Sequence, residues 1–571
     1  MKKYFWIIAF LGAFVFGWVG RNAAAAAMVL FATSAAAQII PPSERPGRES
    51  ERFSQPPAPQ AQPGPGAISL PSTIAPAGAA STAIIMRDIR ITGSTIYSAK
   101  DFLPLYEALL GNKVAVQAIY DLARAITAKY GNDGYVLSRA IVPPQQLSPK
   151  GAIVHIEIIE GYVDRVEWPS KLSRYRDFFT SYTAKITADR PVNIRTIERY
   201  ILLAGDLPGL KFATSLKASE TNKAASTLVV EMTEKHIDAM GRVDNRGTPA
   251  RGPIQYLAAT TLNNLLGQHE ALTLSWASVE PVRELQYYSL NYRQVLNSEG
   301  LTFFAGANSN GGRPGTAALE LLNYRTKGNY FDAGLSYPMI RSRESNLTIS
   351  GLVFSSENHS DILELPFNED RLRGLRGRID ADIADVLRGV NQFNLTLSQG
   401  IQGLGSTVNG NPLASRAVGR VDFSKIEFSA NRTQPLFNPV SVYLASYGQY
   451  AFQPLLSPEQ CGYGGRFFGR AFDPSQLLGD SCFEALAEVR YDIPTVVPQG
   501  GLVQLYGFTD WGRLWTRSAA VGTPAQVEAA SVGGGVRMAY RDYLNVDLQV
   551  AKGVEGPPRG WRFFFAVTAK Y

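Results

Sequence analysis

From Ile237 to the C-terminus, short segments alternate between apolar and polar side chains with a period of two residues. This alternation predicts β-strands that have one apolar and one polar face, and no convincing helix interrupts it. In the last segment, Trp561, Phe563 and Phe565 share one face while Arg562 lies on the other. We identify sixteen candidate strands, which begin near residues 237, 254, 269, 284, 300, 328, 344, 370, 390, 417, 439, 482, 500, 531, 543 and 561.

The connections between these strands alternate in length. Turns after even-numbered strands are short, whereas loops after odd-numbered strands are mostly long: 310–327, 356–369, 403–416, 453–481 and 511–530. Short turns on one side and long loops on the other are typical of outer-membrane barrels, whose strands alternate apolar-out and polar-in. The predicted fold is therefore mainly β, with a sixteen-stranded antiparallel transmembrane barrel at 237–571 and a long sixth outer loop at 453–481.

Residues 84–235 follow a different pattern, in which the order strand, helix, helix, strand, strand occurs twice. Two small α+β units in tandem are expected, at 84–161 and 162–235. The first has helices at 99–110 and 116–130 and strands near 85–91, 136–142 and 152–160; the second has helices at 171–184 and 192–204 and strands at 163–168, 210–218 and 226–233.

The N-terminus has the pattern of an export signal. Two lysines precede an apolar run, and small residues lead to a cleavage site after Ala37, so residues 1–37 are expected to be a signal peptide. A membrane anchor is the alternative, but Arg21 interrupts the apolar run. Residues 38–80 are rich in proline and show no convincing helix, which predicts an extended linker.

Composition supports export and argues against two classes of function. The chain has 52 glycines, 28 phenylalanines and 26 tyrosines, but only 18% charged residues, a profile typical of outer-membrane barrels. Removing residues 1–37 takes away three basic residues and no acidic one, so the net charge falls from +7 to +4, which argues against nucleic-acid binding. The four histidines (His155, His236, His269 and His359) show no metal-ligand or triad spacing, so neither an enzyme nor a bound metal or cofactor is expected.

Several motifs resemble a known family. Ile89–Gly93, Ala128–Tyr135, Val142–Gln145 and Ile158–Gly161 resemble the polypeptide-transport-associated (POTRA) domain of two-partner secretion transporters, the haemolysin secretion/activation family. Phe468–Asp480 is similar to the sixth-loop motif of that family, and Phe508–Gly512 to its companion motif on the thirteenth strand. The resemblance covers most of residues 84–571.

This resemblance implies a set of site residues in the barrel. The sixth loop would fold into the lumen, and Arg470 at its tip would pair with Asp510 on the wall, where a guanidinium can donate a fork of hydrogen bonds to a carboxylate. Ala471 stands where the family usually has glycine, and the N-terminal plug helix frequent in the family has no clear counterpart in residues 38–80. The implied loop residues are Arg470, Phe472, Asp473, Gly479 and Asp480, and the implied wall residues are Phe508, Asp510 and Gly512.

The only two cysteines bracket the glycine-rich part of the sixth loop. Because export takes the chain through an oxidising compartment, we expect a disulfide between Cys461 and Cys482. The ends of the loop leave neighbouring strands near 452 and 483, which would bring the thiols within reach. Two unpaired small residues remain the alternative.

The family resemblance implies an outer-membrane channel that is in contact with lipid, works as a monomer and exports an unfolded secreted partner of β-helical type. We expect the periplasmic POTRA domains to recognise this partner by adding its extended segments to sheet edges, with contacts on the strand Val136–Val142 and the helix Val116–Tyr130. An assembly factor for other barrels, from the same superfamily, and a diffusion porin are the alternatives.

Overall fold

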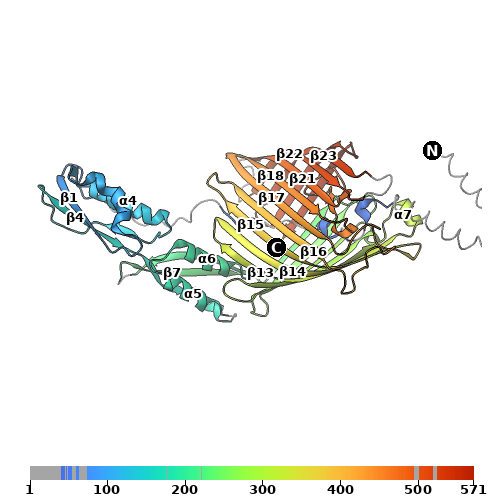
Figure 1. Cartoon of the computed structure of the whole chain (residues 1–571), viewed down its shortest axis with the longest axis horizontal. Helices are drawn as coiled ribbons and strands as arrows, with labels where there is room; N and C mark the ends of the chain where they lie inside the picture. The colour runs from blue at the N-terminus through green and yellow to red at the C-terminus, as the bar shows by residue number, and fades with distance from the viewer. Residues whose placement is uncertain are drawn as a thin grey trace, which may run out of the picture.

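The computed structural model describes residues 40–571 except 46, 48, 54–58, 63–73, 175–176, 220–221, 494–500 and 519–523. The expected signal peptide at 1–37 lies outside the described residues. The molecule is elongated, with two small α+β units at one end and a large barrel at the other (Figure 1). None of the helices in the described residues is long and apolar enough to cross a membrane.

Sixteen antiparallel strands close into one barrel, which confirms the predicted fold class. Its seam joins the first strand to the last, with register pairs from Met240–Lys570 to Asp244–Ala566. Leu274 and Trp276 are exposed on the outer face, as lipid contact requires. The strands are β8 (Ile237–Asp244), β9 (Gln255–Asn263), β10 (Glu270–Val279), β11 (Gln286–Val295), β12 (Thr302–Gly312), β13 (Arg325–Arg341), β14 (Ser345–Ile362), β15 (Leu365–Ala384), β16 (Val390–Gly400), β17 (Ser424–Phe437), β18 (Val440–Ala451), β21 (Ser481–Ile493), β22 (Gly501–Trp515), β23 (Gln526–Tyr540), β24 (Leu544–Glu555) and β25 (Trp561–Lys570).

The prediction of a long loop at 356–369 is wrong. β14 and β15 continue through this region, and only Leu363 and Glu364 form the turn, with φ of 51° and 67°. The polar residues that suggested a loop pair across the strands instead, as Glu357 does with Arg373. Where the strands extend beyond the bilayer, both faces are solvated and can be polar. The sequence of this region therefore does not show the alternation of apolar and polar residues that marks the other strands.

The first α+β unit is a four-stranded sheet in the order β2-β1-β4-β3 with two helices packed on it. The strand predicted at 136–142 is shorter in the structure, where β3 has only three residues, and the short strand β2 was not predicted. Ser98 and Asp101 form a capping box at the start of the first helix. The elements are β1 (Ala83–Thr92), α3 (Ala99–Tyr106), η2 (Glu107–Leu109), β2 (Lys113–Ala115), α4 (Gln117–Asn132), β3 (Arg139–Ile141) and β4 (Ala152–Ile159).

The second unit is a three-stranded sheet in the order β5-β7-β6, which leaves β6 at an edge. Asn193 caps the N-terminus of α6 by accepting a hydrogen bond from the main-chain N of Arg195. The elements are β5 (Tyr162–Glu167), η3 (Ser170–Arg174), α5 (Phe179–Ala188), α6 (Ile194–Gly205), β6 (Leu210–Ala218) and β7 (Ala225–Glu234).

The second unit is docked on the short-turn end of the barrel. Asp206, after α6, accepts two hydrogen bonds from Arg341, at 2.7 and 2.8 Å. Tyr200 on α6 donates a hydrogen bond to Glu299 in the turn between β11 and β12. The short turns are therefore on the same side of the barrel as the two α+β units, and the long loops are on the far side (Figure 1).

Part of the proline-rich region lies inside the barrel and forms short helices, so the prediction of an extended linker at 38–80 does not hold for that part. η1 (Pro42–Glu44) and α2 (Glu49–Phe53) occupy the lumen near the long loops. Phe53 packs against inward residues of the wall such as Leu257. Gln60, by contrast, donates its main-chain N–H to Asp382 at the short-turn end. Apolar periodicity cannot reveal so short a helix.

Candidate functional site in the barrel lumen

The sixth loop folds back into the lumen through a small hairpin of its own, in which β19 (Cys461–Tyr463) pairs with β20 (Leu477–Gly479). Beyond β19, Gly469 adopts φ of 64°, and a side chain there would collide with the ring of Tyr463. Ala471 has no positive φ and is fully buried, so the position after the tip arginine does not need glycine. The loop tip can therefore form with alanine at position 471, where the family usually has glycine.

Arg470 is buried at the loop tip, but its guanidinium does not pair with Asp510 as expected. Its Nη1 donates to Glu488 on β21, and its guanidinium carbon lies 4.6 Å from the centre of the Phe508 ring. Glu488 and Phe508 are direct cross-strand partners, so Arg470 stacks on one and bonds the other. The predicted pairing is wrong because Asp510 lies further along β22.

Asp510 instead fixes the main chain of the loop. It accepts hydrogen bonds from the Arg470 main-chain N (3.1 Å), the Tyr463 hydroxyl (2.7 Å) and the Ser531 hydroxyl (2.7 Å). The two residues named by the motifs are thus brought together, but through the backbone of Arg470. A carboxylate can accept about four hydrogen bonds, and neutral donors already provide three of them to Asp510.

Glu488 was missed by the sequence reasoning. It also accepts hydrogen bonds from Arg490 and Arg537, both at 2.7 Å, so that three guanidinium groups share one buried carboxylate. The available signal was its inward position in the alternation of β21, as Glu488 follows Glu484 on the polar face. A lone glutamate in such a strand is not distinctive without its partners.

The other motif residues hold the loop in place. Phe472 packs against Tyr463, with ring centres 5.4 Å apart, and Asp473 accepts a hydrogen bond from Arg562 at 2.6 Å. Gly512 provides room for the Tyr463 ring on the wall, and Gly479 lies close to Leu514. These residues lie together in one cluster between the loop and β22–β25.

Asp480 is fully buried where the loop returns to the wall. It accepts hydrogen bonds from Arg416 in the loop after β16 and from the main-chain N of Leu455 (3.0 Å) and Arg517 (2.7 Å). Gln460 adds a longer hydrogen bond of 3.3 Å. One carboxylate thus joins the base of the sixth loop to two other outer loops.

Cys461 and Cys482 form a disulfide, which confirms the predicted bond. Its position differs from the expected one. Cys482 lies on wall strand β21, but Cys461 lies on the loop hairpin, where it pairs with Gly479, and not next to the end of β18 at Ala451. The bond therefore ties the inserted loop to the wall and does not join two neighbouring wall strands.

The N-terminal segment, defined here as residues 40–53, is held by a second buried ionic cluster. Glu44 accepts hydrogen bonds from Arg251 (2.6 Å) and Thr248 (2.8 Å) in the loop after β8. Arg251 is fully buried and also lies 3.4 Å from Glu49. A cavity of about 650 Å³, lined by residues that include Arg52, Arg376 and Arg470, lies beside both this segment and the sixth loop.

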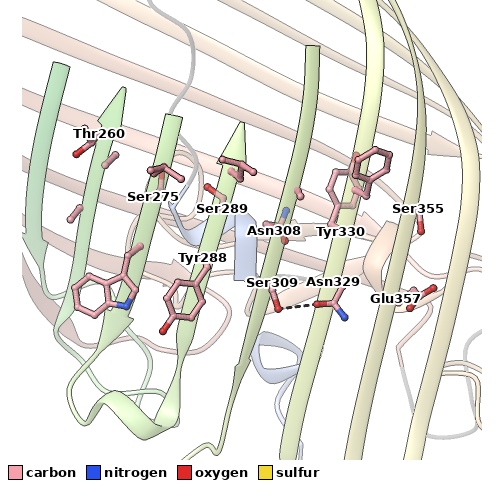
Figure 2. Close-up of a pocket in the computed structure, with 17 residues that line it drawn as sticks. Thr260, Ser275, Tyr288, Ser289, Asn308, Ser309, Asn329, Tyr330, Ser355 and Glu357 are labelled. Atoms are coloured by element: carbon pink, nitrogen blue, oxygen red, sulfur yellow. Dashed lines mark hydrogen bonds between the residues drawn. The ribbon is translucent and has the colours of Figure 1, made fainter. Parts of the chain in front are cut away.

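A further hollow, of about 910 Å³, lies on the wall across β9–β14. Figure 2 shows Tyr288 and, on the strands that follow, the hydrogen bond between Ser309 and Asn329, which is 2.8 Å long. Trp276 and Tyr288 are cross-strand partners on the exposed outer face. This hollow therefore belongs to the aromatic lipid-facing surface and not to the lumen.

In the first α+β unit, the expected contact at Tyr130 is wrong. Tyr130 is fully buried, and its hydroxyl bonds Ser94 and Glu160, both at 2.8 Å. Burial alone would raise the pKa of Glu160, but hydrogen bonds from Thr95 and Tyr130 hold it below its usual value. Val116, Val136 and Val142 are partly buried and pack against the cores of the two α+β units.

The closed sixteen-stranded barrel, the inserted sixth loop and the two small α+β units define an outer-membrane protein transporter with periplasmic domains. Residues 225–538 match the model of the haemolysin secretion/activation protein ShlB/FhaC/HecB family, and residues 84–161 match the ShlB-type POTRA domain. The chain belongs to this family, whose members are transporters in the outer membrane.

Relatives support the same assignment. The chain is 23% identical to the outer membrane transporter CdiB of Dickeya dadantii and 22% identical to the heme/hemopexin transporter protein HuxB of Haemophilus influenzae, each over 78% of this chain and 79% of the relative. The solved structure of CdiB from Escherichia coli has a TM-score of 0.68 at 17% identity and covers 88% of this chain and 94% of its own. CdiB from Acinetobacter baumannii has a TM-score of 0.59 at 16% identity and covers 90% and 95%.

Proposed function

We propose that this transporter exports one secreted partner protein of β-helical type as an extended chain, that it works as a monomer, and that the second POTRA domain (162–235) captures the partner at the free edge of β6. The partner then passes into the barrel lumen beside the sixth loop. The cluster around Arg470, Glu488 and Asp510 holds that loop during transport.

The free edge of β6 is the observation that carries this proposal. β6 is nine residues long, and most of its residues are exposed. Its first residues, Leu210 and Lys211, line a cavity of about 1260 Å³ that is also lined by Arg293 and Tyr571 of the barrel. A peptide added along β6 would therefore lead directly into the periplasmic mouth. The two edge strands of the first POTRA domain, β2 and β3, have only three residues each.

The register of β6 identifies the groups that are free to bind. Lys235 donates its main-chain N–H to Gly209 at 2.8 Å, and Ser219 donates to Ala225 at 3.0 Å, so the odd-numbered residues of β6 pair with β7. In an antiparallel ladder the intervening residues point their N–H groups the other way. The N–H of Thr214 therefore faces the free edge.

A proline substitution tests this edge selectively. Thr214→Pro removes one outward donor without removing a hydrogen bond to β7, and proline is tolerated on edge strands. We expect it to reduce secretion of the partner at unchanged levels of folded barrel, whereas Thr214→Val, which keeps the N–H, should secrete normally. Equal secretion by the two variants would overturn the role of β6.

Deletion of the gene separates this function from the two alternatives. An exporter should lose one large secreted protein, with unchanged levels of other outer-membrane barrels. An assembly factor would instead cause a general loss of those barrels. A diffusion porin would leave both secretion and assembly intact and change only the uptake of small solutes.

A further inference from the structure

The lumen wall between the periplasmic mouth and the tip of the sixth loop has more arginines than carboxylates. Asp244 accepts a hydrogen bond from Arg466 at 2.6 Å and lies 3.2 Å from Nε of Arg242. Nearby, Glu488 is shared by three arginines, one of which, Arg537, has its Nε 3.7 Å from Asp547. Buried or half-buried cations normally have an anion each, so this region lacks negative charge.

A cavity of about 420 Å³ lies within this cationic region. Three arginines (Arg242, Arg466 and Arg537) and one carboxylate (Asp547) line it, together with the polar side chains of Gln504, Asn545 and Thr568. Thr568 is the cross-strand partner of both Arg242 and Asn545, and Gln504 is the partner of Arg537, so these wall residues share one face. Arg466 reaches the same face from the sixth loop, which identifies it as the lumen side.

Arg242 provides the second observation. Only 4% of this residue is exposed, yet its Nη2 has no hydrogen-bond partner in the part of the chain that the structure describes, and its Nε has only the ionic contact with Asp244. A buried guanidinium donor without an acceptor is costly unless an acceptor reaches it. A carboxylate oxygen is a suitable acceptor for this donor.

We propose that this cavity is an oxyanion-binding site that takes a carboxylate. The carboxylate comes either from an acidic side chain of the polypeptide in transit, a source that rests on the proposed function, or from a small free dicarboxylate. The site lies on the route from the mouth to the loop tip, so an acidic side chain bound there would be held next to Arg537 and the Glu488 cluster.

Calorimetric titration of the purified full chain in detergent tests the site without any export assay. The probes are an extended peptide with alternating glutamates, the same peptide with glutamines, and sodium succinate. We expect a carboxylate probe to bind, and Arg242→Gln to weaken that binding about tenfold, the loss expected for one charge-assisted hydrogen bond. Arg371→Gln, which removes an exposed arginine on β15, is the matched control and should bind normally.

The pattern of binding separates the two sources. Binding of the glutamate peptide but not of the glutamine peptide identifies an acidic side chain as the ligand, and binding of succinate alone identifies a free anion. Failure of all three probes, or equal binding by Arg242→Gln and the unmodified chain, would overturn the site. Intact probe binding together with unchanged secretion after deletion of the gene would count against the proposed function only.

A second variant covers the case in which Arg242→Gln fails to fold. Thr568→Glu places a carboxylate directly across from Arg242. It should raise the thermal unfolding temperature and abolish binding of the carboxylate probe, because the site then has its own anion. A lower unfolding temperature with unchanged probe binding would contradict the proposal.

Discussion

The sixth loop and the N-terminal segment both occupy the barrel lumen, but different kinds of contact hold them. The loop joins wall strands at both ends and is tied to β21 by the Cys461–Cys482 disulfide. The N-terminal segment has no covalent bond to the wall in the described residues, and the ionic cluster of Glu44 and Arg251 holds it. The two meet where Gly47, with φ of 92°, lies against Pro458.

This difference indicates whether the sixth loop or the N-terminal segment can leave the lumen more easily. Displacing the N-terminal segment requires only that buried ion pairs be exchanged for water. The disulfide, in addition, holds Cys461 of the loop at β21, so the loop can withdraw only as far as the residues between the two cysteines allow. We therefore expect the loop to remain in the barrel while the segment moves, and the following predictions test that contrast.

The largest effect is expected at the loop tip. Arg470→Ala leaves Glu488 with fewer partners, and breaking a buried ion pair costs about 3–5 kcal/mol, so export should fall at least tenfold. Glu488→Gln should have a similar effect, and the double variant should be scarcely worse than either single variant, because the residues act as one pair. Quantifying the secreted partner at equal barrel levels measures this, and additive losses would show that the pair does not act as a unit.

A smaller effect is expected for the N-terminal segment. Glu44→Gln removes the main charge partner of Arg251, so the segment should leave the lumen more readily. The fraction of time that the barrel is open in planar bilayers, and with it the mean conductance, should rise by roughly tenfold. Glu320→Gln, which removes an exposed partner of Arg283 in an outer loop, is the control and should not change conductance. Unchanged conductance in Glu44→Gln would mean that this cluster does not hold the segment.

The disulfide should affect stability more than export. Replacing both cysteines by serine should lower the free energy of unfolding by about 3 kcal/mol in the chain-entropy model, since the bond closes a loop with a sequence separation of 21 residues. Urea unfolding in detergent, with and without reductant, measures the difference. Mass spectrometry of non-reduced peptides should find residues 461 and 482 joined, and free thiols at both positions would contradict the assignment.

The smallest effect is expected at the base of the loop. Arg416→Gln removes two donors from Asp480, which keeps its bonds to the main chain of Leu455 and Arg517, so stability should fall by about 1.5–3 kcal/mol. Arg420→Gln, which changes an exposed pair with Asp422, is the control. A loss of export as large as that of Arg470→Ala would show that the base, and not the tip, holds the loop.

Most of the fold was predictable because its signals are local. The alternation in segments such as Trp561–Lys570 follows from lipid on one face and a polar lumen on the other, and it led to the correct number of strands. The turn at Leu363–Glu364 was missed, since polar side chains continue along β14 and β15 beyond the bilayer. The five-residue helix α2 was missed because it is too short to show a helical period.

The candidate site was predictable only in part. The motifs located Arg470 and Asp510 in one region, and the cysteine pair was correctly joined. The acceptor of the Arg470 guanidinium was not predictable, because Glu488 lies on β21 and becomes its partner only through the strand register that places it across from Phe508. Tyr130 was assigned to a binding surface, although its helical position turns its side chain into the core.

Periodicity, composition and spacing are properties of neighbouring residues, and they were enough to predict the barrel, the two α+β units, the outer-membrane location and the cysteine pair. The three-dimensional contacts were needed to show that Arg470 pairs with Glu488, that Glu44 meets Arg251 across more than two hundred residues, and that Arg242 lies buried with an unused donor. These contacts depend on where a loop and a terminal segment come to rest inside a closed sheet. No local pattern records that position, because it is set by which buried charges find partners once the barrel has closed.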